Sequence, residues 1–433
     1  MNPQAKALNE TIAAKNAVIL DLLSEKGKNI FFPKLGILGQ AADAKSTRIN
    51  ATIGTAVEDD GSPMCLKSIS SRVDMPASSI FPYAPSFGRP DLRTQWQEML
   101  VEKNPSLDGT PISLPIVTCA LTHAVSMIGY LFMNEGDEII LPELYWGNYN
   151  LALCNAYGAQ MKKYNAFANN ALDLNALETA INAGGVGKKI IMLNFPNNPT
   201  GYSPRIDEAQ EIANIMLSAA EKGNKIVAVC DDAYFGLVYE EGIEKQSIFS
   251  YLADLHENIL AVKIDGPTKE DYVWGFRVGF ITYGVKGGDA ELYAALENKT
   301  AGAVRGNISN AANISQSLLV EAFRSETYTQ EKEAKFNLLA ERYQSVKEAL
   351  QDEKYAKYFS PLPYNSGYFM CVQLAEGLDG EAVRKLLIEK YSIGVINLNG
   401  VIRVAFSAMP ASQSKELFEG LYAACKELTT HNS

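Results

Sequence analysis

The sequence predicts an α/β protein with a second, smaller domain, and three observations lead to that expectation. The chain has 433 residues, which is more than one hydrophobic core usually supports. Between about residues 115 and 285, short apolar runs alternate with helical segments. After about residue 310 this alternation ends. Continuous apolar runs between helices are typical of a largely parallel sheet that is covered on both faces, and the change near residue 310 indicates a separate α+β unit.

The individual elements follow from their periodicity. Residues 5–27 carry apolar side chains at helical spacing, and Gly27 predicts the end of that helix. An extended stretch then leads to residues 48–54. The clearest predicted strands are residues 138–142, 189–193, 225–230 and 259–263, with a further strand at 280–283 and helices such as 207–222 between them. In the smaller unit, a helical stretch at 311–352 precedes strand-like pieces at 368–372 and 401–405.

Composition excludes several classes of partner. The net charge of -11 argues against a nucleic-acid partner, because phosphate binding needs a basic face. The six cysteines include no CxxC pair, so we expect neither a disulfide framework nor a metal site. The N-terminus lacks the basic start and apolar core of a signal peptide, and no apolar run approaches the ~18 residues that cross a bilayer. We therefore expect a cytoplasmic protein that does not contact a membrane.

Polar segments follow two of the predicted strands directly, where ligand sites of open α/β sheets lie. The sequence NFPNNPTG, residues 194–201, comes after strand 189–193. Taken alone, such an Asn/Pro/Gly cluster is typical of a turn. Asp231 and Tyr234 follow the next strand. A carboxylate at the end of an apolar run is costly to bury unless it pairs with a cation, such as a protonated ring nitrogen; the neighbouring Asp232 can instead be a helix N-cap.

A lysine and an arginine follow the strand 259–263. Lys269 precedes Gly275, Arg277 and Gly279 by six, eight and ten residues. A lysine becomes a nucleophile at neutral pH when it is partly desolvated and close to other cations. Arg277 supplies such a charge and can also grip a phosphate with two parallel hydrogen bonds. Without its neighbours, a lysine near two glycines is more often a surface residue.

The sequence TCALTHA, residues 118–124, precedes a helical run. Backbone amides at a helix start, together with a threonine hydroxyl, make a cradle for an anion. His123 lies in this segment and is one of only three histidines. We interpret it as a packing or cofactor-proximal residue, because a lone histidine is weak evidence for catalysis.

Together these segments resemble the class I/II aminotransferases, which are fold-type I pyridoxal-phosphate enzymes, and the nearest motifs are those of aspartate and aromatic aminotransferases. The resemblance implies that Lys269 holds pyridoxal 5'-phosphate as a Schiff base. It places Asp231 at the pyridine nitrogen of the cofactor, where the acid keeps the ring an electron sink. It places Asn198 and Tyr234 at the phenolic oxygen. Trp146, in the segment LPELYWGN, corresponds to the aromatic residue that stacks on the pyridine ring.

The resemblance also implies a phosphate site and a departure within it. The residues that correspond to phosphate ligands share hydroxyl, amide or guanidinium donors, and they are Ala120, Leu121, Thr122, Thr268, Arg277 and, from the neighbouring subunit, Tyr83. Three residues before the lysine the family usually has a serine, where this chain has Gly266. The usual glycines of the segment 118–124 are replaced by Ala120 and His123. These departures indicate a divergent branch of the class I/II aminotransferases that the chain resembles.

Four further residues correspond to substrate-binding positions. Arg403 resembles the arginine that clamps the substrate α-carboxylate, and Ile53 with Gly54 resembles the flexible loop on the substrate side. Arg305 resembles the arginine that binds a side-chain carboxylate across the dimer. Its alternative role is to cap a helix or to form a surface ion pair.

The architecture that the resemblance implies has two domains and two subunits. A large domain at 60–310 holds a mostly parallel sheet of the seven-stranded type between helices. A small α+β domain is built from both termini, 1–59 and 311–433, and the N-terminal helix packs with it. The active site lies at the interface of a homodimer.

The predicted reaction moves an amino group between an L-amino acid, with dicarboxylic and aromatic ones as candidates, and a 2-oxo acid. Kinetics are expected to be ping-pong, because the amino group rests on the cofactor between the two half-reactions. A lyase or decarboxylase with the same cofactor is the alternative, since fold does not dictate chemistry. A non-catalytic ligand-sensing domain would need a basic DNA-binding module, which we do not find. A nucleotide-binding Rossmann enzyme is disfavoured, because the glycines do not compose GxGxxG after a first strand.

Overall fold

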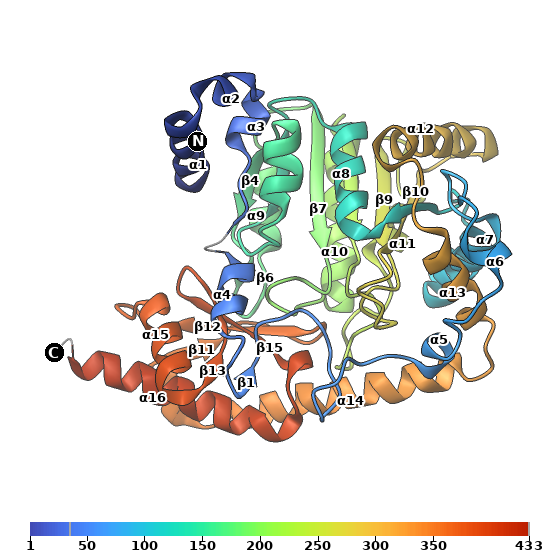
Figure 1. Cartoon of the computed structure of the whole chain (residues 1–433). Coiled ribbons are helices and arrows are strands. Elements are labelled where there is room, and N and C mark those ends of the chain that lie inside the picture. Colours follow the sequence, from blue (N-terminus) through green and yellow to red (C-terminus); the bar gives the residue numbers. More distant parts are fainter. Residues whose placement is uncertain (34–35, 432–433) are drawn as a thin grey trace.

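The computed structural model describes residues 1–33 and 36–431, and its centre is a seven-stranded sheet (Figure 1). Strand β10 is antiparallel to both of its neighbours, and the other pairs are parallel. This is the mostly parallel α/β sheet that the sequence predicts. Across the sheet the strands run in the order β2 (Ile116–Cys119), β10 (Val278–Gly284), β9 (Ile259–Asp265), β8 (Lys225–Asp231), β7 (Lys188–Asn194), β3 (Glu138–Pro142) and β4 (Gln160–Tyr164).

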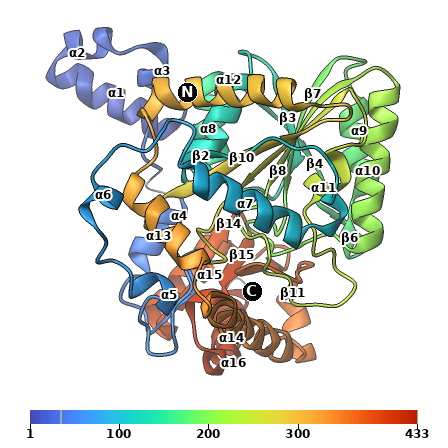
Figure 2. The ribbon, with the colours of Figure 1, turned by 90° about the vertical axis from the view of Figure 1, so that its right-hand side faces the viewer.

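Helices bury both faces of this sheet. Successive residues of a strand point to opposite faces, so Ile191 packs in one core cluster and Ile190 in another. The first cluster lies under α9 (Leu174–Asn182), α10 (Ile206–Glu221) and α11 (Ile248–Leu252). The second lies under α8 (Ala120–Phe132), the π-helical turn η2 (Asn150–Asn155) and α12 (Ala290–Ile308). Figure 2 shows α9 and α10 on one side of the sheet and α8 on the other. Burial on both faces explains why these strands are continuously apolar.

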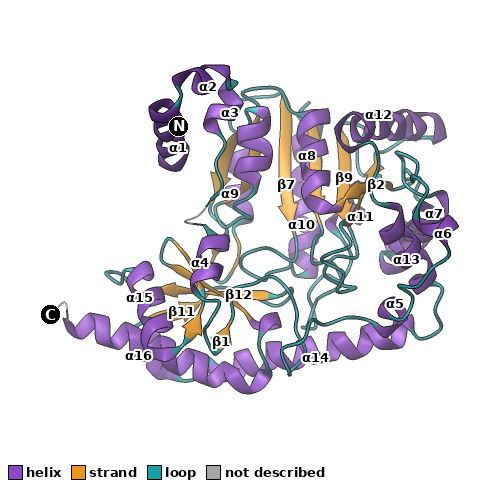
Figure 3. Ribbon diagram, in the orientation of Figure 1, coloured by secondary structure: helices purple, strands orange, loops and turns teal. Residues whose placement is uncertain are grey.

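The smaller domain is an antiparallel sheet covered by helices (Figure 3). Its four strands are β11 (Phe359–Pro361), β12 (Phe369–Leu374), β15 (Val401–Ala405) and β14 (Ile396–Leu398), in that order. Helices α15 (Gly380–Leu386) and α16 (Ser414–His431) pack with it. The long helix α14 (Tyr328–Ala349) runs from the large domain into this core, and Figure 1 shows it along the base of the molecule.

The predicted helix at 5–27 is three helices, α1 (Pro3–Lys15), α2 (Ala17–Leu22) and α3 (Glu25–Asn29). Asn16 makes the break, because its extended backbone ends α1 and its side chain accepts the amide of Val18 as the N-cap of α2. The predicted end at Gly27 was wrong, since this residue lies inside α3. The long helical stretch at 311–352 is likewise two helices, α13 (Asn313–Phe323) and α14.

The first 60 residues divide between the two domains. Helix α3 contacts the large domain, because the Lys26 amine lies 5.9 Å from the ring centroid of Tyr157. Helix α4 (Ile37–Asp43) joins the small domain, because the Gln40 side chain exchanges two hydrogen bonds with the backbone of Asn397. Strand β1 (Ile49–Asn50) pairs with β13 (Ile393–Gly394). The division into 60–310 and two terminal parts remains a prediction. The expectation that the N-terminal helix packs with the small domain was wrong, because α3 contacts Tyr157 of the large domain and the packing with the small domain begins at α4.

The remaining elements are helix α7 (Pro90–Lys103), which packs Leu92 and Trp96 into the large domain, and several short segments. The short segments are α5 (Lys67–Ser70), α6 (Ala77–Ile80), η1 (Pro105–Leu107), β5 (Phe167–Ala168), β6 (Ala171–Leu172), η3 (Glu353–Lys357), η4 (Leu387–Tyr391), η5 (Phe406–Ala408) and η6 (Ala411–Gln413). Within the described ranges, no helix is long and apolar enough to cross a membrane.

Gly201 joins the large domain to the small one. Its carbonyl accepts hydrogen bonds from the backbone amides of Asn365 and Ser366, both at 2.9 Å. Its φ is +72°, and a Cβ at this position would lie 1.8 Å from the carbonyl oxygen of Phe369. Neither the backbone conformation nor the space allows a side chain here.

We expect Gly201→Ala to lower the free energy of unfolding by more than ~3 kcal/mol, because a β-strand backbone must move to admit the methyl group. Gly242→Ala is the matched control, since Gly242 has φ +76° and a Cβ added there would meet no atom within 4 Å. The control should cost only the ~1 kcal/mol of the left-handed backbone. Urea unfolding of both variants measures the difference, and equal losses would contradict the tight contact.

Candidate active site

The carboxyl ends of β7, β8 and β9 bring the predicted site together. Asn194 and Asp231 are paired across β7 and β8, and the Asn194 side chain donates to the Asp231 carbonyl at 2.8 Å. The Asn194 side chain also accepts the backbone amide of Asn198 at 2.8 Å. These bonds fix the turn after β7 to the end of β8. Asn198 and Asp231 therefore face one site, as the order of the segments predicts.

Asp231 is a buried carboxylate, with 3% of its surface exposed. Tyr149 donates its hydroxyl proton to one carboxylate oxygen, and the Ala233 amide donates to the other at 3.2 Å. Burial raises the pKa of Asp231, while the Tyr149 hydrogen bond and the charge of Lys269 oppose that rise. Among the described residues, none forms an ion pair with Asp231 at 4.0 Å or less. A buried carboxylate without an ion-pair partner is suited to bind a positively charged group of a ligand.

Lys269 lies in the loop after β9, and its amine is 5.1 Å from the ring centroid of Tyr234. Burial lowers the pKa of Lys269 from 10.5 to about 8, opposed by Asp231 and assisted by Arg277. Desolvation disfavours the charged amine, so a substantial fraction is unprotonated near neutral pH. The Tyr234 side chain is itself only 4% exposed, and burial raises its pKa.

Arg403 reaches this site from strand β15 of the small domain. Its guanidinium donates to the Asn198 side chain at 3.1 Å and to the carbonyl of Thr52 at 2.8 Å. It lies 4.3 Å from the ring centroid of Phe369 and is 2% exposed. Its Nε has no hydrogen-bond partner, and no carboxylate of the described chain pairs with it. A buried guanidinium without an acid matches an anionic ligand.

Thr52, the backbone partner of Arg403, leads directly into the predicted substrate loop. A Cβ on Gly54 would lie 3.0 Å from the ring of Phe369 and 3.4 Å from the Tyr234 hydroxyl. Gly54 is thus packed against the site, whereas the side chain of Ile53 is 46% exposed.

The N-terminus of α8 lies against β10, beside the lysine loop. A Cβ on Gly279 would stand 2.7 Å from the carbonyl carbon of Ala120 and 3.0 Å from the Leu121 amide nitrogen. Gly266 is equally confined, since its Cβ would lie 2.8 Å from the Val278 carbonyl oxygen and 3.3 Å from a Leu121 methyl. A side chain at Gly266, such as the serine that the family usually has, would fit only if these neighbours moved.

Other residues expected at the phosphate differ in exposure. Thr268 is buried, and Thr122 in the first turn of α8 is exposed. Arg277 is exposed, has φ +54° and donates to the Trp274 carbonyl at 3.0 Å. The His123 Nδ1 accepts the Cys119 amide at 3.0 Å, and burial lowers the His123 pKa. These features are consistent with a packing residue.

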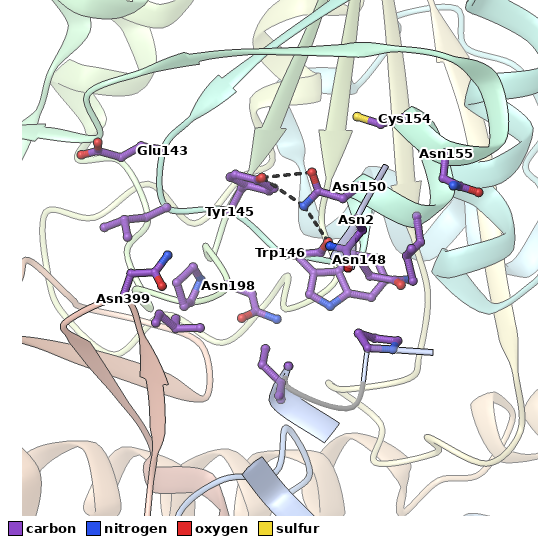
Figure 4. Close-up of a pocket in the computed structure, with 18 of the residues that line it drawn as sticks. Asn2, Glu143, Tyr145, Trp146, Asn148, Asn150, Cys154, Asn155, Asn198 and Asn399 are labelled. Atoms are coloured by element: carbon purple, nitrogen blue, oxygen red, sulfur yellow. Dashed lines mark hydrogen bonds between the residues drawn. The ribbon is translucent and has the colours of Figure 1, made fainter. Parts of the chain in front are cut away.

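Trp146 contacts Tyr149, whose hydroxyl donates a hydrogen bond to Asp231. Its ring packs edge-on against Tyr149, with centroids 5.4 Å apart. Trp146 and Asn198 also line a cavity of ≈ 2320 Å³ (Figure 4). This cavity extends toward α3 and α4 and meets the site only at its inner end.

Tyr83 and Arg305 do not join the site within this chain. Tyr83 is 91% exposed, and Arg305 is an exposed residue that donates to the Ser309 hydroxyl at 2.9 Å. Their predicted roles across a dimer stay predictions. Tyr149 is the residue that the sequence reasoning missed; its position three residues after Trp146 was the available signal.

A covered, mostly parallel sheet brings a lysine and a buried acid together at its carboxyl ends, and the small domain adds a buried arginine; this is the arrangement of pyridoxal-phosphate enzymes of fold type I. Residues 67–421 match the family described as aminotransferase class I and II. The chain therefore belongs to that family and is a pyridoxal-phosphate-dependent aminotransferase. The unpaired charges of Asp231 and Arg403 fit such a cofactor with its substrate.

Individual proteins show the same relationship. The chain is 27% identical to an aspartate aminotransferase of Bacillus sp. (strain YM-2) over 293 residues, 67% of this chain and 68% of that protein. It is 28% identical to a probable aspartate/prephenate aminotransferase of Aquifex aeolicus, of which it spans about half, 48%. The crystal structure of an aminotransferase from Anaerococcus prevotii superposes with a TM-score of 0.82 at 25% identity, covering 93% of this chain and 99% of that one. These matches do not favour the lyase or ligand-sensing alternatives.

We expect Tyr149→Phe to weaken pyridoxal-phosphate binding at least ~10-fold, because it removes a hydrogen bond to a charged group, worth ~1.5–3 kcal/mol. The loss should grow on acidification, since the bond that lowers the pKa of Asp231 is gone and the neutral acid no longer attracts a cation. Absorbance of the bound cofactor against pH measures both effects. Tyr145→Phe is the control, because the Tyr145 hydroxyl bonds only Asn150 in the described structure; equal behaviour of the two variants would refute the role of Tyr149.

Proposed function

We propose that this aminotransferase transfers the amino group of an L-amino acid to a 2-oxo acid by a ping-pong mechanism, with Lys269 as its catalytic residue. The observation that supports this assignment is that the half-buried Lys269 amine, with its lowered pKa, and the buried Arg403 guanidinium form no ion pair within the described chain. An amino acid offers a carboxylate to Arg403 and an α-carbon to the Lys269 side.

Pyridoxal phosphate, when bound, supplies an electron-withdrawing ring that stabilises negative charge at the substrate α-carbon. Asp231 would pair with the ring nitrogen, and its hydrogen bond from Tyr149 favours the ionised carboxylate by lowering its pKa against the effect of burial. Asn198 and Tyr234 would contact the phenolic oxygen, and Trp146 would stack on the ring. The first turn of α8 (Ala120, Leu121, Thr122), with Thr268, Arg277 and a partner subunit's Tyr83, would hold the phosphate.

Lys269 would move the proton. With a pKa of about 8, its free amine could accept the proton of the substrate α-carbon and donate it again. Arg403, Asn198 and the Ile53–Gly54 segment would hold the substrate carboxylate so that the bond to that proton faces Lys269.

The preferred amino donor is proposed to be dicarboxylic, with an aromatic amino acid as the alternative. Arg305 carries no ion pair among the described residues and lies exposed at the end of α12. In a homodimer it would bind the side-chain carboxylate in the partner's site. Six free cysteines are consistent with a reducing cytoplasm, which we propose as its location.

The decisive experiment is an absorption spectrum of the purified protein with added pyridoxal phosphate, followed by titration with L-glutamate, L-aspartate and L-alanine. A visible band that is absent in Lys269→Ala and is bleached by one amino acid would support the function and identify the donor. Loss of the glutamate or aspartate response in Arg305→Ala, with that to alanine retained, would support the dicarboxylate role. A band that no amino acid changes would contradict transamination.

A second test follows from the lowered pKa of Lys269. We expect the rate at which pyridoxal phosphate becomes covalently linked to rise nearly tenfold per pH unit below about 8, and to level off above it, because only the free amine attacks an aldehyde. Stopped-flow absorbance at several pH values gives this profile. A rate that is still rising tenfold per unit at pH 10 would show that the lysine keeps the ordinary pKa near 10.5.

A further inference from the structure

A buried acidic pair follows Lys269 directly in the sequence. The side chain of Glu270 is 5% exposed and that of Asp271 is fully buried. Neither belongs to the motif by which the family was identified above. Two carboxylates at this depth are costly unless cations and hydrogen bonds compensate them.

Two lysines from distant helices compensate these acids. Lys103, the last residue of α7, places its amine 2.9 and 3.0 Å from the two Glu270 carboxylate oxygens. Lys332, in the first part of α14, lies 2.6 Å from Glu270 and 3.1 Å from Asp271. The Tyr328 hydroxyl donates to Asp271 at 2.6 Å. Burial alone would raise the pKa of Glu270, but the two lysines hold it at about 2.

The backbone around Lys269 is held just as closely. The Asp271 amide donates to the Pro267 carbonyl at 3.0 Å, and the Tyr368 hydroxyl donates to the Lys269 carbonyl at 2.7 Å. Glu270 also abuts the loop of Tyr234, because a Cβ on Gly236 would lie 3.0 Å from its carboxylate oxygen. Glu270 is therefore the point where the lysine loop, the Tyr234 loop, α7 and α14 meet.

The cluster does not act on the Lys269 amine by charge. The pKa of Lys269 is set by burial, then by Asp231 and Arg277, while the two acids and two lysines of the cluster cancel one another. Buried ion pairs are also often no more stabilising than apolar side chains of the same size. What they add is a fixed geometry, and helix α14 is the element that continues into the small domain.

We propose that Glu270 is a positioning residue for Lys269: by binding Lys103 and Lys332 at once, its carboxylate fixes the lysine loop to α7 and α14. This rests on the assignment of Lys269 as the catalytic residue. Lys103 lies on α7 and Lys332 on α14. Both contacts are therefore needed to fix the position of the loop, and of the Lys269 amine, relative to the substrate.

The test uses Glu270→Gln in the holoenzyme, with the amino donor that the wild type accepts. We expect the visible cofactor band to remain and kcat to fall at least ~10-fold with KM changed less than ~3-fold, since a small displacement of a catalytic group slows chemistry more than binding. The double variant Lys103→Met/Glu270→Gln restores the charge balance. It should recover the thermal midpoint of unfolding but not kcat.

Glu297→Gln is the matched control, because Glu297 forms a similar part-buried pair with Arg93 at 2.7 Å, away from the lysine loop. It should lower the thermal midpoint and leave kcat unchanged. If Glu270→Gln fails to fold, Glu270→Asp keeps the charge but is too short to reach both lysines, and the same fall in kcat is expected.

Two results would overturn the positioning role while leaving the function intact: recovery of kcat in the double variant, or a kcat for the folded Glu270 variant no lower than that of Glu297→Gln. Absence of the visible band or of donor turnover in the wild type would instead overturn the proposed function itself.

Discussion

The site depends on charges that are buried without partners. Asp231 and Arg403 are buried, Lys269 is half-buried beside them, and no ion pair within the described chain neutralises Asp231 or Arg403. Such groups destabilise the folded chain on their own, so the surrounding structure has to hold them in place. The seven-stranded sheet does this by burial on both of its faces, and a cofactor and substrate of complementary charge recover the lost stabilisation.

Residues of both domains form the site. Arg403 belongs to the small-domain sheet, yet its side-chain partner is Asn198 after β7 of the large one. The carbonyl of Gly201, three residues after Asn198, accepts hydrogen bonds from the backbone amides of Asn365 and Ser366 of the small domain. Arg403 and Asn198 are thus held close to the contact that joins the domains. A change in domain packing is expected to change the site as well, because Arg403 reaches it from the small domain.

Most of the sheet and the main site residues could be predicted from the sequence, because local patterns determine them. Buried strands are continuous apolar runs, and Asn198, Asp231 and Lys269 follow three of them directly. Tyr149 could not be predicted in the same way, since its bond to Asp231 spans 82 residues and depends on how η2 packs on α8. The helix break at Asn16 depends on one side-chain bond. The lysines that hold Glu270 come from helices 167 and 62 residues away, so only the fold reveals them.

The departures from the family motif at the phosphate side are linked by packing. Gly266 stands where the family usually has a serine. A Cβ at this position would lie 3.3 Å from a Leu121 methyl group. Gly279 of β10 in turn allows the backbone of Ala120 and Leu121 to approach, and Ala120 adopts φ +60°. A side chain at either glycine would require its neighbours to shift. In the proposed function the phosphate would rely on the backbone amides of α8 and on Arg277, because Gly266 has no hydroxyl to offer.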